Sequence, residues 1–211
     1  VGITGQRYDI TARSSGDQNA AFNIKGVVDL SNPNAPQYSF GGSVQSLNLT
    51  TLGFYSGGNL SLKGDLDANL RGADLNTING TVKGNGVVIN LNGQTIPLDS
   101  LNARIVQETG RVEVDFASSI LQATLRGNTR LGDIATELQQ HIDRYFDLPD
   151  VQYRASSVAR QFTFEVNVPR TGARLLPRFV SGLTRISPFQ LTGAYDSRAA
   201  SLTVRSDIAR I

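Results

Sequence analysis

The stretch NLSLKGDLDANLRG, residues 59–72, alternates apolar and polar side chains with a period of two. Leu60, Leu62, Leu66 and Leu70 take alternate places together with a glycine and an alanine, and charged or polar residues stand between them. A period of two sends successive side chains to opposite faces of a β-sheet and fits no helix. This stretch therefore predicts a strand with one apolar and one solvated face.

The same alternation continues as far as Asn128. It returns in Val87–Leu91, Leu101–Ile105, Val112–Phe116 and Leu121–Leu125. The breaks between these runs carry turn residues, at Asn79-Gly80, Asn92-Gly93, Thr109-Gly110 and Ser118-Ser119. Asn-Gly is the strongest short hairpin signal, so Asn79-Gly80 is expected to be a hairpin turn. Consecutive hairpins make antiparallel neighbours, and we expect a sheet of roughly 12 to 14 strands that grows in chain order.

We expect the whole chain, 1–211, to be one β segment of a larger protein. Its parts are N-terminal strands over 1–58, central hairpin repeats over 59–128, a helix over 129–149 and C-terminal strands over 150–211. The composition also bears on this. Met is 0, which favours a piece cut from a longer chain. Lys+Arg 20 against Asp+Glu 18 gives no sign of a nucleic-acid partner, and Cys 0 leaves the redox compartment open.

A single long helix is predicted from Arg130 to Phe146. Its apolar residues follow the 3, 4, 7 spacing of one helix face and are Leu131, Ile134, Ala135, Leu138, Ile142 and Tyr145. Leu148-Pro149 is expected to end it. A lone amphipathic helix in a β chain must lay this stripe on the apolar side of the sheet. His141, the only histidine, is expected at a solvated position of the helix.

The residues that could carry chemistry are few. The paired carboxylates Asp65 with Asp67 and Glu113 with Asp115 stand at i, i+2, which puts each pair on the solvated face of a strand. Charge is needed at those places for solubility, so we expect no catalytic residue, no metal site and no cofactor, and a protein that is not an enzyme.

Diffuse phrases along most of the chain resemble the bacterial TamB/AsmA-like family, in its Bacteroidota form. Asn59–Val82 resembles the family's repeated strand with its "dl..l.G.v" phrase, and Leu98–Phe116 with Leu121–Gly127 resembles its "lDsl.a" to "l.a.l.G" phrase. Ile134–Pro149 resembles the helix that follows, and Leu175–Ile211 resembles a closing phrase with "l.G.yd". Nothing matches the family's N-terminal membrane anchor or its C-terminal domain.

The resemblance implies a periplasmic, bridge-like protein, anchored in the inner membrane by parts of the parent chain not present here. It implies a long curled antiparallel sheet, a β-taco, whose apolar groove carries phospholipid acyl chains between the inner and outer membranes. It also implies a role in outer-membrane biogenesis and protein translocation, with an Omp85-type outer-membrane barrel as a partner of the full-length protein.

The expected fold class is accordingly mainly β, a curled antiparallel sheet with one amphipathic helix packed on its apolar side. The side chains expected to line the groove are Leu60, Leu62, Leu66, Leu70, Val87, Ile89, Leu91, Leu101, Ile105, Val112, Val114, Phe116, Leu121, Leu125, Phe162, Phe164 and Val166. Those expected to cap it from the helix are Ile134, Leu138, Ile142 and Tyr145.

The sequence is also compatible with two other interpretations of fold and function. A two-sheet β-sandwich shows the same alternation, because it buries both apolar faces against each other and needs no ligand. An assembly or chaperone module would instead bind outer-membrane β-barrel clients by pairing a strand with an exposed sheet edge.

Overall fold

The computed structural model describes residues 6–17, 20–48, 50–51, 58–146, 159–178 and 185–208. Within them the chain forms one open, eleven-stranded antiparallel sheet in which the strand order follows the chain order from β1 to β11. The strands are β1 (Arg7–Asp17), β2 (Ala20–Asp29), β3 (Gln37–Asn48), β4 (Leu60–Arg71), β5 (Asn79–Leu91), β6 (Gln94–Glu108), β7 (Arg111–Ser118), β8 (Gln122–Gly127), β9 (Gln161–Val168), β10 (Phe189–Asp196) and β11 (Ser201–Ile208).

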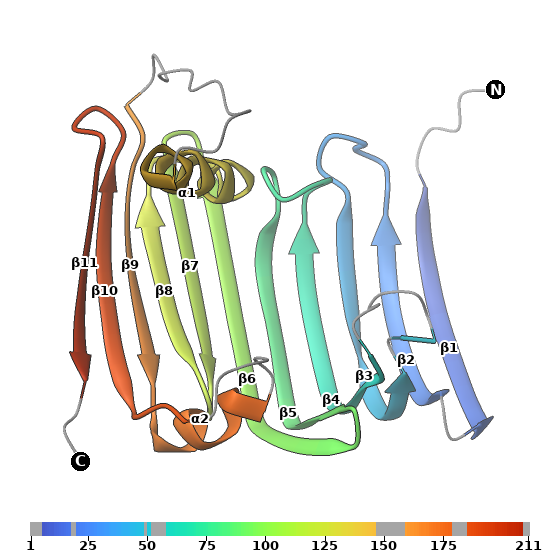
Figure 1. Ribbon diagram of the computed structural model, residues 1–211. Coiled ribbons are helices and arrows are strands. Elements are labelled where there is room, and N and C mark those ends of the chain that lie inside the picture. Colours follow the sequence, from blue (N-terminus) through green and yellow to red (C-terminus); the bar gives the residue numbers. More distant parts are fainter. Residues whose placement is uncertain are drawn as a thin grey trace.

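Figure 1 shows these strands side by side, with β1 at one edge and β11 at the other. In the described part of the chain no second sheet faces this one, since all its strands belong to the single sheet. The mainly β class and the growth of the sheet in chain order are thus confirmed, and the described strands do not form a two-sheet sandwich. The expected 12 to 14 strands are too many, because pairs of short predicted strands join into one.

The merging is clearest in β6, which runs for 15 residues and begins well before the predicted strand Leu101–Ile105. Asp99 has a φ of 56° there, and the register with β5 shifts around Val87. An extra residue of this kind makes a bulge that bends a strand without ending it. The break in the apolar–polar alternation just before Leu101 is therefore a bulge within one strand and not a turn between two strands.

Asn79-Gly80 is not a hairpin turn, so that prediction is wrong. Both residues belong to β5, and the turn between β4 and β5 lies before them, over 72–78. The glycine is needed for a different reason: a Cβ at Gly80 would lie 1.9 Å from the backbone oxygen of Asn69 on β4. Asn92-Gly93 and Thr109-Gly110 do form the turns expected of them.

Helix α1 spans Leu131–Phe146, as predicted from the spacing of its apolar residues. Its first backbone N–H groups donate to side chains from elsewhere in the chain, Leu131 to Gln107 at 2.9 Å and Gly132 to Asn76 at 3.0 Å. These partners satisfy donors that a helix start leaves unpaired. Figure 1 shows α1 lying across one end of the sheet, over the neighbourhood of β7 and β8.

A second, short helical segment lies at the opposite end of the sheet (Figure 1). It consists of α2 (Arg170–Leu175) and the 3-10 turn η1 (Leu176–Arg178). Gly172 permits the close approach, because its Cβ would lie 1.9 Å from the backbone oxygen of Ile120.

Two clusters of buried residues hold these helices on the sheet. The first consists of Val87, Ile96, Leu98 and Ile120, with Leu175 of α2 packed against it. The second consists of Val112, Ile134, Phe162 and Tyr195, and includes Leu131 and Leu138 of α1 at its margin. Within the described residues, no helix is long and apolar enough to cross a bilayer.

Candidate functional site

The strand register sorts side chains onto two faces of different character. Paired residues of neighbouring strands point to the same face, so a row of partners can be followed across the whole sheet. One such row, which we call the central row, is Ile10, Gly26, Phe40, Ala68, Val82, Ala103, Phe116, Ala123, Val166, Leu191 and Ser206. Ser206 is its only polar member. The face that carries this row is called the apolar face below.

The adjacent row on the α1 side is equally continuous. It consists of Tyr8, Val28, Tyr38, Leu70, Gly80, Ile105, Val114, Leu125, Phe164, Gly193 and Val204. Two glycines of this face, Gly26 in the central row and Gly193 in the adjacent row, leave no gap, because phenylalanine rings from the next strand lie over them. A Cβ at Gly26 would lie 2.3 Å from the Phe40 ring, and one at Gly193 would lie 2.2 Å from the Phe164 ring.

Most of the residues predicted to line a groove meet on this apolar face and are half-buried there. They are Leu60, Leu62, Leu66, Leu70, Ile89, Leu91, Leu101, Ile105, Val114, Phe116, Leu125, Phe164 and Val166. Leu121 is half-buried but lies in the connection before β8 rather than in the strand predicted for it.

Val87, Val112 and Phe162 are different, since each is at most 2% exposed. They are centres of the two packing clusters and contact the protein's own side chains. A hydrocarbon ligand has no access to them as they stand. Of the predicted capping residues, Ile134 is buried and Leu138 is half-buried beside it. The side chains of Ile142 and Tyr145 lie outside the described part of the structure.

The central row lies between the two clusters. Leu66 and Leu101, on one side of it, pack against the first cluster, and Val114 and Phe164, on the other, pack against the second. Among the described residues, neither cluster includes Val82, Ala103, Phe116, Ala123 or Val166. This middle band is therefore the part of the apolar face that α1 and α2 do not pack against.

A polar contact inside the second cluster fixes α1 on the sheet. Glu137 of α1 is buried, accepts a hydrogen bond of 3.0 Å from the Tyr195 hydroxyl, and forms an ion pair with Arg160. Tyr195 in turn stacks on Phe162 with ring centroids 4.9 Å apart. A buried carboxylate needs such partners, because losing them leaves a charge without solvation.

His141 belongs to the same contact, and the prediction that it is solvated is wrong. The residue is 4% exposed and its ring meets Tyr195 edge-on, with centroids 5.5 Å apart. It lies four residues after Glu137, and this spacing puts both on the helix face that meets the sheet. The sequence pattern counted only aliphatic and aromatic residues on that face, which is why it missed them.

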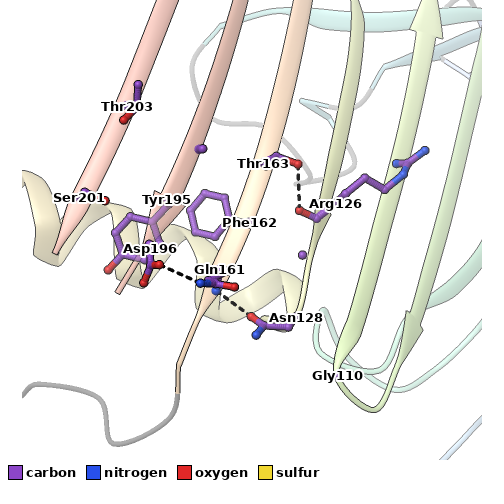
Figure 2. A pocket seen from close by; sticks show the side chains of 12 residues that line it. Gly110, Arg126, Asn128, Gln161, Phe162, Thr163, Tyr195, Asp196, Ser201 and Thr203 are labelled. Atoms are coloured by element: carbon purple, nitrogen blue, oxygen red, sulfur yellow. Dashed lines mark hydrogen bonds between the residues drawn. The ribbon is translucent and has the colours of Figure 1, made fainter. Parts of the chain in front are cut away.

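The opposite face of the sheet is polar and carries several hollows. The one in Figure 2 has a volume of about 540 Å³ and lies over β8 to β11, with Arg126, Gln161, Thr163 and Thr203 in its lining. The hollow in Figure 2 is crossed by hydrogen bonds between its own residues, such as Gln161 to Asp196 at 2.8 Å. Two further hollows, over β1 to β5 and over β5 to β8, also lie on this face.

Two carboxylates of this face, Asp196 and Glu113, have a pKa below the ordinary value. Gln161 and the backbone N–H groups of Ala199 and Arg198 donate to Asp196 and lower its pKa. A hydrogen bond and charge from Arg111 lower the pKa of Glu113, and Asp115 forms an ion pair with Arg126. Asp196 and Glu113 are therefore poor proton donors near neutral pH. In the described chain no three His, Asp or Glu residues are grouped so as to hold a metal ion.

The predicted helix stop at Leu148-Pro149 lies outside the described residues. Comparison with known proteins finds no matching family model and no match among curated proteins or solved structures.

Proposed function

We propose that the apolar face binds hydrocarbon chains, and that this chain is a segment of a periplasmic bridge-like protein that carries phospholipid acyl chains between the inner and outer membranes. The observation that supports this is the central row, an unbroken series of apolar positions across ten of the eleven described strands, over which the described residues place no second sheet. In this proposal the sheet curls around the row and makes it the floor of an apolar groove.

The dimensions suit an acyl chain. Strands about 4.8 Å apart make a row across eleven strands about 48 Å long, and the neighbouring row lies about 7 Å away along the strands. Burial is worth about 0.8 kcal/mol per methylene, so a chain of about sixteen carbons gains on the order of 10 kcal/mol before the cost of ordering it. This affinity is spread evenly along the row, which lets a lipid move from one strand to the next.

A surface of this kind has to be covered by something. Soluble monomers rarely leave a contiguous apolar patch of more than a few hundred Å² exposed, and larger patches mark binding sites. In the proposed setting the cover is lipid, the polar face meets water, and a full-length parent with an outer-membrane barrel partner delivers the cargo.

The proposal is tested by binding an acyl chain that carries an environment-sensitive fluorophore. Ala103→Glu puts a carboxylate in the central row, and Asn102→Glu puts the same group on the polar face one residue away in β6. We expect Ala103→Glu to weaken binding about tenfold or more, since a charge beside hydrocarbon loses hydration, and Asn102→Glu to leave it unchanged. Equal binding by both variants, or no binding by the native chain, contradicts the proposal.

A further inference from the structure

Among the described residues, no strand pairs with the outer edge of β1. β1 is 11 residues long and contains neither proline nor lysine, and its register with β2 shifts only near its end, between Ser14 and Asp17. Natural sheets protect their edges with short strands, prolines, lysines or bulges, because the free backbone groups pair readily with another strand. Tyr8 and Ile10 on this strand are also 46% and 37% exposed.

The direction of each backbone group of β1 follows from its pairing. Leu30 donates to the backbone oxygen of Gln6, so even-numbered residues of β1 hydrogen-bond to β2. Hydrogen-bonded and free positions alternate along an antiparallel strand. Arg7, Asp9, Thr11 and Arg13 therefore point their N–H and C=O groups outward.

We propose that this edge binds the same edge of a second copy of the chain, with the two β1 strands antiparallel around a two-fold axis at Thr11. In that register Asp9 lies opposite Arg13 of the second copy, and Arg13 lies opposite its Asp9. The outward-pointing residues face each other, so three pairs of residues form about six backbone hydrogen bonds.

Charge favours this register and this partner. Within its own chain, Asp9 has the apolar Val27 as its cross-strand neighbour. Arg13 donates from its Nε to Asn23, and its outer nitrogens bond no other described residue. A register centred on Ile10 would instead put Arg7 opposite Arg13 of the second copy. Oppositely charged residues across a strand pair attract and like charges repel, so the register at Thr11 is preferred.

The axis is normal to the sheet, and this has a consequence for the apolar face. Both copies turn that face to the same side, with Ile10 beside Ala12 of the second copy. The combined face then spans about 100 Å at about 4.8 Å per strand. The association rests on β1 alone and holds whether or not the face binds lipid.

Sedimentation equilibrium of the intact chain over a range of concentrations tests the proposal. We expect the native chain to dimerise and Thr11→Pro to be monomeric, because the proline removes an outward donor at the axis without breaking a bond to β2. The matched control is Val204→Pro on β11. The Ser197 N–H donates to the backbone oxygen of Arg160, so the odd-numbered residues of β10 bond β9 and its even-numbered residues bond β11. The partners of those even-numbered residues are the odd-numbered residues of β11, so the backbone groups of Val204 point outward. This variant should dimerise like the native chain.

Charge reversal tests the register itself. Asp9→Arg and Arg13→Asp should each raise the dimer dissociation constant roughly tenfold, since each puts two like-charged pairs in the interface. The double variant should restore the native value. Circular dichroism of each variant checks that it is folded. A monomeric native chain, a dimer that survives Thr11→Pro, a dimer lost equally with Val204→Pro, or a double variant that is not restored would overturn the proposal.

Discussion

Single side chains decide how α1 is held on the sheet, and Tyr195 is the most informative of them. Its ring lies between Phe162 and His141, and its hydroxyl donates to the buried carboxylate of Glu137. One tyrosine therefore joins the apolar cluster to the one buried ion pair that the described residues show.

Removing that hydroxyl gives the first prediction at this scale. Tyr195→Phe keeps the ring stack but takes a donor from buried Glu137, and we expect a loss of about 1–3 kcal/mol in the free energy of unfolding. Urea denaturation measures it. Tyr8→Phe on the exposed edge strand is the control and should change stability by less than about 0.5 kcal/mol. Equal effects of the two variants would mean that the Tyr195–Glu137 hydrogen bond does not stabilise the helix contact.

Acid sensitivity is a second property set by single residues. Hydrogen bonds lower the pKa of Asp74 in the folded chain, first from the Thr77 hydroxyl and then from the Asn76 backbone, below the ordinary value of 3.8. A lowered folded pKa means that the folded state binds fewer protons, so the stability from Asp74 is complete above 3.8 and is lost as the pH falls through the folded pKa.

Asp29, Glu113 and Asp196 are shifted in the same direction, so the melting temperature of the native chain should fall as the pH is lowered below about 4.5. Asp74→Asn should be less stable than the native chain at pH 7 and approach it in acid. Melting curves from pH 7 to pH 2.5 measure this. A constant difference across that range would show that the Asp74 carboxylate contributes nothing through its charge.

At the scale of elements, the sequence predicts the strands well and their ends poorly. Period-two alternation located the strands from β4 onward because one face of the sheet is apolar and the other solvated throughout. Helix α1 was found by the same reasoning with a period of 3.6. The turn predicted at Asn79-Gly80 was wrong because the sequence does not distinguish a glycine that allows two strands to approach closely from a glycine that forms a turn.

The candidate site likewise has features that the local sequence predicts and features that it does not. Alternation could place Ile105 and Phe116 on the apolar face, since that is a local property. It could not show that Val87 and Val112 are covered, because their cover comes from Ile120 and α1, which lie elsewhere in the chain. The contact between Glu137 and Arg160 joins residues 23 positions apart and leaves no local signal.

The two roles of glycine can be separated by matched substitutions. Gly80 and Gly110 both have a positive φ, of 136° and 74°, but only Gly80 has neighbours where a Cβ would stand. We expect Gly110→Ala to cost about 1 kcal/mol from backbone strain and Gly80→Ala about 3 kcal/mol, because strand β4 must also move away. Urea unfolding of both variants measures the difference. Similar costs would indicate that β4 yields freely at Asn69.

At the scale of the whole molecule, an open sheet with two short helical covers should have an uneven core. Most of the buried apolar residues gather in two clusters at opposite ends of the strands, and the central row runs between them. Stability should come mainly from the clusters and the hydrogen-bonded ladder. The central row can then be shaped by what it binds rather than by what it packs against.

Two valines of β5 test this unevenness within one strand. Val87 is 1% exposed in the first cluster, whereas Val82 is half-buried in the central row. Val→Thr replaces a methyl group by a hydroxyl of similar size, so Val87→Thr should cost about 2 kcal/mol for an unpaired buried hydroxyl and Val82→Thr less than about 0.5 kcal/mol. Urea denaturation in the absence of lipid measures both. Equal and large costs would mean that the protein's own side chains seal the central row, and a sealed row has no space for an acyl chain.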